Sequence, residues 1–141
     1  MYKTLTAFIL AAATNCPLVD VAGKYTFDLR TEQASSWYRV DGNFGCRKTA
    51  RTEWHGIKIN PDGTMVGGEV VWSQGGAKSG VFAGRVEPGS EPMQWVASAG
   101  DIEMKGIWKR GQISGEFVQR FIEGGKEIEC RGKVSGFKTG K

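Results

Sequence analysis

The feature that most limits the fold of this chain is the alternation of apolar and polar residues in short runs. In KYTFDLR, residues 24–30, Tyr25, Phe27 and Leu29 alternate with charged or hydroxyl-bearing residues. The same period of two recurs in residues 101–108 (DIEMKGIW), 112–121 (QISGEFVQRF) and 126–134 (KEIECRGKV). Successive side chains of a strand point to opposite faces, so each run predicts a half-buried β-strand. Helical periodicity is hard to find after residue 22.

Turn signals separate these runs at short intervals. NPDG at 60–63 suits a type I turn, KRG at 109–111 and EGGK at 123–126 separate further strand pairs, and EPGSEP at 87–92 is a longer polar connection. The predicted strands lie near 23–30, 36–40, 51–59, 64–73, 80–86, 93–98, 101–108 and 111–122, with 126–137 as a ninth. This spacing predicts an all-β domain, namely a small antiparallel up-and-down β-barrel of about eight strands. A two-sheet sandwich is the alternative.

One phrase occurs twice in the chain, as GIKINPDGTMVGGEVV at 56–71 and GIWKRGQISGEFV at 106–118. Each copy predicts one hairpin. Glycine makes up 21 of the 141 residues, about twice the usual share. A glycine within a strand weakens it unless it bends the sheet or lets backbones approach, and a small barrel needs such bends. We therefore predict curvature at Gly67, Gly68, Gly106 and Gly115, with a bulge at the additional glycine of the first copy.

The N-terminus has the pattern of an export signal. Lys3 precedes the apolar run LTAFILAAA at 5–13, and Ala11 and Ala13 fit the small-residue cleavage pattern. We predict a signal peptide at 1–13, an N-terminal segment at 14–22 and a β-barrel domain at 23–141, in a secreted or periplasmic protein. The run is too short to span a bilayer, so no membrane span is expected. The alternative is an ordinary N-terminal helix or strand packed on the domain.

Three cysteines bear on the compartment and the cross-links. Export would permit disulfides, and we pair Cys46, which follows the glycine-rich stretch DGNFG, with Cys130 in the last predicted strand. Cys16 is then free or intermolecular. In the alternative, all three are reduced, buried residues. There is no CxxC motif and only one histidine, so no metal site is expected.

The charged residues give no sign of a nucleic-acid site or an enzyme. The net charge is +4, but acidic and basic residues are interspersed, which is typical of a mixed solvated surface. No phosphate-binding, dinucleotide-binding or calcium-loop motif occurs, and no cofactor is expected. A lone histidine such as His55 is more often a surface or structural residue than a catalytic one. We therefore expect no enzymatic activity.

The five tryptophans are the most suggestive side chains for binding, because tryptophan buries a large area at low entropic cost. Core packing is expected to account for three or more of them. Trp72 and Trp108 occupy comparable ends of the two repeated hairpins. They are the first candidates to line a ligand site, together with Tyr25 on the first strand.

Two resemblances bear on the fold. GKYTFDLRT at 23–31 resembles the opening strand of the avidin family, although Phe27 and Thr31 stand where that family has its biotin-binding asparagine and serine. Most of the chain resembles small secreted proteins common in alphaproteobacteria, through GKYTF at 23–27, GCR at 45–47, NPDG at 60–63 and ECRG at 129–132. The second resemblance implies export and a β-barrel, and it names no activity.

These observations together predict an exported, non-enzymatic binding protein. Its target is either a small ligand in the barrel or a protein partner bound through loops. Protease inhibition is one form of binding to a protein partner, with residues 31–36 (TEQASS) or 87–92 as the inhibitory loop. The alternative function is a structural role in an extracellular or envelope assembly. The pattern leaves open whether the protein is a monomer or a homo-oligomer.

Overall fold

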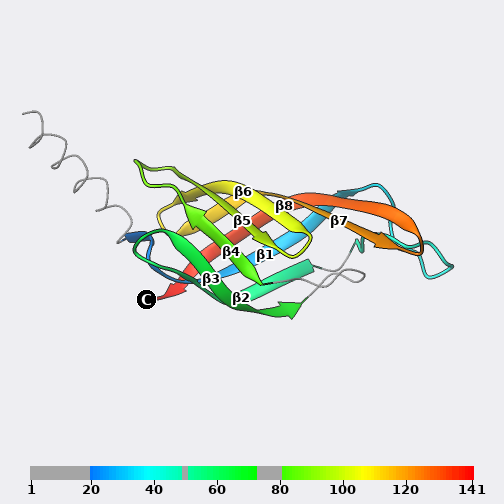
Figure 1. Cartoon of the computed structure of the whole chain (residues 1–141), viewed down its shortest axis with the longest axis horizontal. Helices are drawn as coiled ribbons and strands as arrows, with labels where there is room; N and C mark the ends of the chain where they lie inside the picture. The colour runs from blue at the N-terminus through cyan, green and yellow to red at the C-terminus, as the bar shows by residue number, and fades with distance from the viewer. Residues whose placement is uncertain (1–19, 49–50, 73–80) are drawn as a thin grey trace, which may run out of the picture.

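The computed structural model describes residues 20–48, 51–72 and 81–141, and it contains eight β-strands. In chain order these are β1 (Gly23–Ala34), β2 (Arg51–Ile59), β3 (Thr64–Trp72), β4 (Phe82–Val86), β5 (Met93–Ala99), β6 (Ile102–Lys109), β7 (Gln112–Glu123) and β8 (Lys126–Gly140). Each strand pairs antiparallel with the next, and β8 pairs with β1, so the sheet closes into a barrel (Figure 1). The predicted up-and-down barrel is confirmed, and the sandwich alternative is wrong.

The strand predicted near 36–40 is also wrong. In this segment Trp37 and Arg39 form only isolated bridges, to Cys46 and Asn43. Gly42 lies in the turn between Arg39 and Asn43 and has a left-handed φ of 118°. The chain turns back on itself here, so no neighbouring strand is available to extend a ladder. The predicted signal peptide at 1–13, its cleavage site and Cys16 lie outside the described residues.

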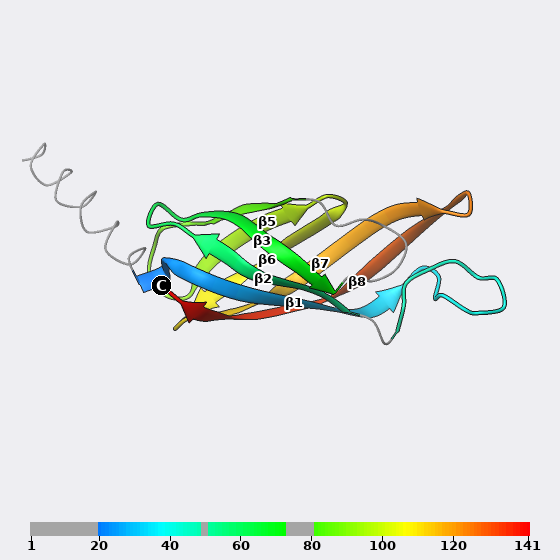
Figure 2. The ribbon, with the colours of Figure 1, turned by 90° about the horizontal axis from the view of Figure 1, so that it is seen from below.

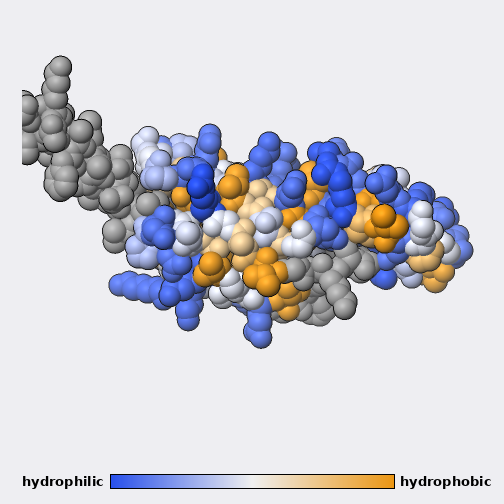
Figure 3. Space-filling model, in the orientation of Figure 1, coloured by the Kyte–Doolittle hydropathy of each residue, from blue (hydrophilic) through white to orange (hydrophobic). Residues whose placement is uncertain are grey.

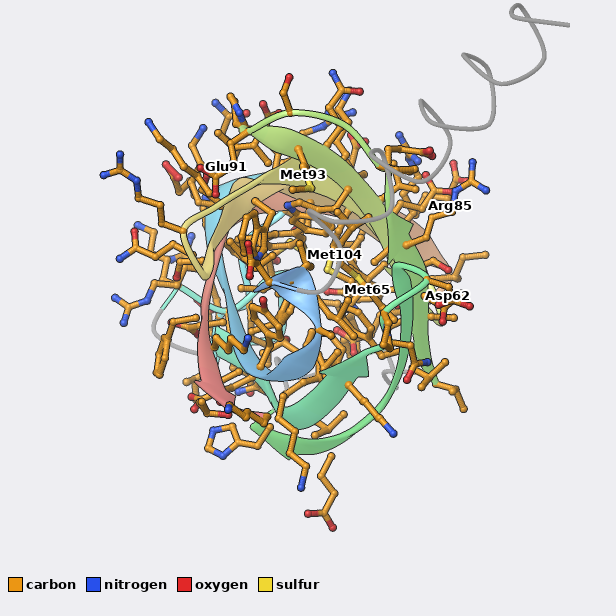
Figure 4. The ribbon with its side chains drawn as sticks, turned by 90° about the vertical axis from the view of Figure 1, so that its left-hand side faces the viewer. Asp62, Met65, Arg85, Glu91, Met93 and Met104 are labelled. Carbon is orange, nitrogen blue, oxygen red and sulfur yellow. A yellow bond between two sulfur atoms is a disulfide. The ribbon has the colours of Figure 1, made fainter. Side chains whose placement is uncertain are left out.

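Inward-facing side chains fill the barrel with its main hydrophobic core. The alternation is clearest in β5, where every second residue from Met93 to Ala99 is buried. Seen from one end, Met65 and Met104 lie inside the ring of strands, while Asp62, Arg85 and Glu91 project outward (Figure 4). The largest side chains with less than 2% exposure are Trp54, Trp95, Tyr25, Phe27, Phe82, Leu29, Ile57, Ile59, Met65, Ile102, Ile128 and Gln119.

Two of the predicted curvature glycines admit a tryptophan to the core. Gly106 and Gly115 pair directly across β6 and β7, and Trp95 pairs with Gly106 from β5. The Trp95 Nε1 atom donates to the carbonyl oxygens of Ile107 at 3.1 Å and Ser114 at 3.3 Å. The indole therefore extends across the glycine pair, and a Cβ atom on either glycine would fall on backbone atoms of the opposite strand.

The first copy of the repeated phrase bends differently. Gly67 and Gly68 have positive φ values of 79° and 91°, and Gly56 on β2 has φ of 72°. The β2–β3 register is continuous from Trp54 to Ile59, so the bulge predicted at the additional glycine is not there. The β2–β3 register shifts only between Glu53 and Trp54. Against β1, the register of β2 shifts between the partners of Tyr25 and Phe27, where His55 and Gly56 both lie opposite Thr26. This shift keeps Trp54 and Ile57 both buried although three positions separate them.

Candidate functional site

Two of the three predicted ligand residues lie together in the core. The Tyr25 hydroxyl accepts a hydrogen bond from Trp108 Nε1 at 2.8 Å and donates one to the Val21 carbonyl at 2.7 Å. Burial raises the pKa of Tyr25, and the hydrogen bond from Trp108 lowers it in smaller part. β3 ends at Trp72, whose side chain lies outside the described residues. The polar atoms of Tyr25 and Trp108 thus bond to each other in the core. A ligand role for the three residues stays a prediction.

Aromatic rings occupy the middle of the barrel in edge-to-face contact. The ring centroids of Phe27 and Phe82 lie 5.0 Å apart, and those of Phe27 and Trp95 lie 5.5 Å apart. The Trp54 ring lies 5.5 Å from that of Phe82, and the buried Trp54 Nε1 makes no hydrogen bond. Such contacts are the geometry that aromatic pairs prefer in a close-packed core. Side chains of the protein therefore fill the space that a ligand inside an eight-stranded barrel would need.

A buried amide and a carboxyl group lie at the end of the barrel where β1 ends. Gln119, 2% exposed, faces inward from β7 and its Nε2 atom donates to Asp101 Oδ1 at 3.2 Å. Burial raises the pKa of Asp101, and the hydrogen bond from Gln119 opposes this shift. Asp101 follows Gly100 in the β5–β6 turn. The pair satisfies a buried polar group at this end of the core.

Beyond the same end, a loop is joined to β8 by a disulfide. Cys46 and Cys130 are bonded with their Cα atoms 5.9 Å apart, which confirms the predicted pairing. We call residues 35–48 together with the end of the β7–β8 hairpin, residues 121–129, the stapled tip. Figure 2 shows that the β7–β8 hairpin and the loop after β1 project at the same end, opposite the C-terminus. A disulfide is typical of an oxidising compartment.

The backbone of the stapled tip is held by hydrogen bonds. Ser35 N donates to the Glu129 carbonyl, and Glu129 N donates to Ser35 Oγ, both at 2.9 Å. Within the loop, Tyr38 N donates to the Cys46 carbonyl at 2.9 Å. Beneath this backbone lies a second, small hydrophobic core of Cys46, Ile128 and Cys130, with Ala34, Trp37 and Phe121 packed against it. The tip is thus an ordered extension of the barrel.

Apolar side chains are exposed on this ordered surface. Val40 is 93% exposed, Ile122 is 73% exposed and Phe44 is 47% exposed. The Phe44 ring lies against Gly124 in the β7–β8 turn, so the loop and the hairpin present one surface. The Arg47 guanidinium lies 4.0 Å from the centroid of the Tyr38 ring, which places a cation beside the apolar residues.

Two of the grooves on the outer surface of the barrel wall differ in their lining. The larger, of about 800 Å³, crosses β4 to β8; its outward-facing residues include Ala83, Arg85, Val96, Ser98, Glu103, Lys105, Glu116, Val118 and Arg131. We call it the outer groove. The second, of about 660 Å³, lies over β1, β2, β7 and β8 and includes His55. There His55 Nε2 bonds to the Glu53 carboxylate, and both residues are outward-facing.

The loops predicted for protease inhibition lie apart. Residues 31–34 belong to β1, and residues 35–36 begin the stapled tip. Residues 87–92 connect β4 to β5 at the opposite end of the barrel, where Glu91 Oε1 accepts a hydrogen bond from Arg110 N at 3.1 Å. The structure therefore brings only the first of the two loops to the tip.

Neither a search of protein-family models nor a search of curated proteins found a match to this chain. Within residues 20–48, 51–72 and 81–141, no three or more histidine, cysteine or acidic side chains are grouped to hold a metal ion. In that same part of the chain, no helix is both long enough and apolar enough to cross a membrane.

Sequence reasoning missed the stapled tip as a surface. It interpreted residues 36–40 as a strand and expected the ligand residues to lie inside the barrel. A signal was present, because Tyr38, Val40 and Phe44 surround the turn-forming residues Asp41, Gly42 and Asn43. Apolar residues that flank such a turn, in a segment that ends at a bonded cysteine, are typical of an ordered exposed loop.

Proposed function

We propose that this chain is an exported, non-enzymatic binding protein that contacts a protein partner through the stapled tip. The observation that carries the proposal is the exposure of Val40, Phe44 and Ile122 on a surface held by the Cys46–Cys130 disulfide. Exposed apolar side chains gathered at one end of a protein are a mark of interaction sites. Full burial of a valine or isoleucine side chain is worth about 1.5–3 kcal/mol, so two or three contacts of this size could anchor a partner.

The order of the tip supports binding as well. A loop that is free in solution loses conformational entropy when it binds, and a preformed loop avoids most of that loss. Here the disulfide, the bonds between Ser35 and Glu129, and the packing of Trp37 hold the backbone. Tyrosine and arginine side chains are enriched in protein interfaces, and Tyr38 and Arg47 stack beside the apolar residues.

A protein partner fits these features better than a ligand inside the barrel. Trp54, Trp95 and Phe82 fill the interior, and Tyr25 and Trp108 satisfy each other. Val40, Phe44 and Ile122 of the tip, in contrast, are exposed. Inhibition of a secreted protease is one activity that such a preformed loop could supply.

Export is part of the proposal. Its support is the signal-like pattern at residues 1–13, together with a disulfide that an oxidising compartment would preserve. The compartment is then the periplasm or the extracellular medium. The mass of the protein recovered from that compartment tests this part: cleavage after Ala13 and one disulfide are expected, whereas an uncleaved chain with free thiols would contradict export.

Site-specific photo-crosslinking tests the partner. A photoreactive amino acid is placed at Val40 in the full chain, and at Phe137 as a matched control, since Phe137 is an apolar residue with 57% exposure outside the tip. We expect a protein to crosslink at Val40, to be competed by excess unlabelled protein, and not to crosslink at Phe137. The identified partner is then purified, together with any protease among the crosslinked products.

Binding of the purified partner is measured by calorimetry. The variant Val40→Asp should weaken binding at least tenfold, and Phe137→Asp should leave it within twofold of the wild type. Equal crosslinking at the two positions, or equal affinity of the two variants, would overturn the proposal. Saturable quenching of tryptophan fluorescence by a small molecule, without a tip-dependent protein partner, would favour the ligand alternative.

A further inference from the structure

We propose that the groove over β1, β2, β7 and β8, which we call the side groove, binds a neutral saccharide on the outside of the barrel. Its volume of about 660 Å³ lies in the range of small-ligand sites. In the closed sheet β7, β8, β1 and β2 are consecutive neighbours. Four strands spaced by about 4.8 Å give the groove a floor about 14 Å wide, which suits a short oligosaccharide.

The strand register places polar side chains in a row across the side groove. Ser114 on β7 pairs with Ser135 on β8, which pairs with Asp28 on β1. Asp28 pairs in turn with Glu53 on β2, and all four side chains line the groove. Hydroxyl groups both donate and accept hydrogen bonds, and carboxylates accept them. The row therefore matches the mixture of donors and acceptors that the hydroxyl groups of a sugar ring present.

An exposed aromatic ring lies beside this row. Phe137 on β8 is 57% exposed, and the register places it between Gln112 on β7 and Thr26 on β1. The C–H face of a sugar ring is apolar and packs on an aromatic ring, while the sugar hydroxyls project to the sides. Gln112 and Thr26 carry hydrogen-bonding groups on either side of Phe137, and both line the groove. The side groove is thus amphipathic in the same way as a saccharide.

Contacts within the protein favour a neutral ligand over a charged one. Arg30 Nε donates to Asp28 Oδ2 at 3.2 Å, and His55 Nε2 bonds to the Glu53 carboxylate. A cation would have to displace these groups, whereas a ligand hydroxyl can use the lone pairs that remain on the carboxylates. Among the described residues that line the side groove, none is lysine or arginine. An anion would therefore meet the negative charge of the carboxylates without a basic side chain to bind.

The same contacts fix the two carboxylates before a ligand arrives. The side chains of Asp28 and Glu53 are 21% and 14% exposed, so neighbouring atoms restrict them while a ligand hydroxyl can still reach them. Groups that are already held in place lose little conformational entropy on binding. The side groove is in this sense prepared for a ligand.

The test compares neutral sugars with charged counterparts of the same backbone. The full chain is screened against an array of neutral oligosaccharides of glucose, galactose, mannose and N-acetylglucosamine, and binding is then measured by calorimetry. We expect at least one neutral oligosaccharide to bind, and its counterpart carrying an amine or a carboxylate to bind at least tenfold more weakly. Raising the salt concentration should leave the affinity for the neutral sugar within twofold, because no charge is paired. Failure of every neutral sugar to bind at millimolar concentration, or a preference for a charged counterpart, would overturn the inference.

Variants locate the sugar in the side groove. Phe137→Ala removes the aromatic platform and should weaken binding about tenfold, and Gln112→Ala should weaken it to a smaller extent. Thermal unfolding of both variants should match that of the wild type, because both side chains are exposed. Unchanged affinity of Phe137→Ala would place the sugar elsewhere and contradict the inference.

The outer groove supplies a matched control. Its residue Val96 on β5 is apolar and 47% exposed, and Figure 3 shows hydrophobic surface in the middle of the face over β3–β6. Val96→Ala should bind the sugar like the wild type, and an equal loss in Val96→Ala and Phe137→Ala would refute the site. Val40→Asp, in the stapled tip, should also bind the sugar normally. The inference about the side groove can therefore fail while the proposed function of the tip holds, and the reverse.

Discussion

At the scale of single residues, buried polar groups in the barrel are joined to specific partners. Tyr25 links Trp108 to the Val21 carbonyl, and Gln119 bonds to Asp101. A buried donor that loses its partner carries the full cost of its desolvation, whereas the net gain from making the bond is smaller. The consequences of single substitutions should therefore depend on which partner is left behind.

Tyr25→Phe removes the oxygen that accepts the hydrogen bond from Trp108 Nε1. Because the indole N–H and the Val21 carbonyl would stay buried without this partner, we expect the free energy of unfolding to fall by about 1–3 kcal/mol. Urea denaturation, monitored by far-ultraviolet circular dichroism, measures this change in the free energy of unfolding. Tyr38→Phe, at an exposed tyrosine, is the control and should change stability by less than about 0.5 kcal/mol. Equal stabilities of the two variants would contradict the structural role of the pair.

Asp101 makes stability depend on pH. Burial raises its pKa in the folded state, so the folded protein holds the proton more tightly than the unfolded chain does. Its contribution to stability is therefore complete below the unfolded pKa of about 3.9 and is lost as the pH rises through the folded pKa. Asp101→Asn keeps an oxygen for Gln119 and has no charge to bury. We expect this variant to be more stable than the wild type at neutral pH.

The measurement is denaturant unfolding of both proteins across the acidic range. The difference in free energy of unfolding should shrink toward zero below roughly pH 3.5, where the wild-type carboxyl is protonated in both states. A difference that is independent of pH would show that the carboxyl charge is not the cause.

At the scale of elements, the turn at 60–63 and the inward glycines show how local residues shape strands. Gly63 N donates to the Asn60 carbonyl at 2.8 Å, which confirms the predicted turn. The Gly106–Gly115 pair has a different role in the sheet. It makes room for the indole of Trp95, which comes from a third strand, β5. A sequence can show that a glycine interrupts an apolar run, but it does not show which distant side chain occupies the space.

Gly106→Ala should be costly for that reason. The new Cβ atom would meet the backbone of Ser114 and Gly115, so β6 and β7 would have to separate. We expect a loss of about 2–3 kcal/mol, in the range of overpacked cores. Gly89→Ala is the matched control, because nothing lies within 4 Å of its added Cβ atom. Guanidinium unfolding should separate the two variants, and similar midpoints would refute the packing argument.

At the scale of the whole molecule, the barrel closes by pairing its first strand with its last. β1 and β8 pair from Lys24 with Gly140 to Ala34 with Cys130. The Cys46–Cys130 disulfide joins residues 84 positions apart next to this closure. It restricts the unfolded chain in the same region that the closure must bring together.

Cys46→Ser/Cys130→Ser should therefore lower stability without changing the fold. For a loop of this length the chain-entropy model gives about 4.5 kcal/mol, with native-state strain as a correction. Urea unfolding of the variant and the oxidised wild type measures the difference. Hydrogen exchange should show faster exchange at Tyr38 and Cys46 amides, while the β5–β6 amides stay protected. Equal midpoints would mean that the cross-link does not restrict the unfolded state.

Several features could be predicted from the sequence because they depend on local pattern. The period of two identified β1, β6, β7 and β8, and turn residues separated the further runs, so a barrel of about eight strands was predicted. The cysteine pair was also predicted from position. Residues 36–40 were mispredicted because alternation describes only which face a side chain takes. Whether a strand forms also depends on a neighbour with free hydrogen-bonding groups.

By itself, the sequence determined most of the strand segments, the turns between them and the cysteine pair, because each depends on nearby residues or on a few candidates. Only the tertiary structure decided that Tyr25 and Trp108 bond to each other, that Val40 and Ile122 share one exposed end, and that Lys105 stands beside Glu116. These facts depend on closure and register, which are set by the packing of all eight strands together.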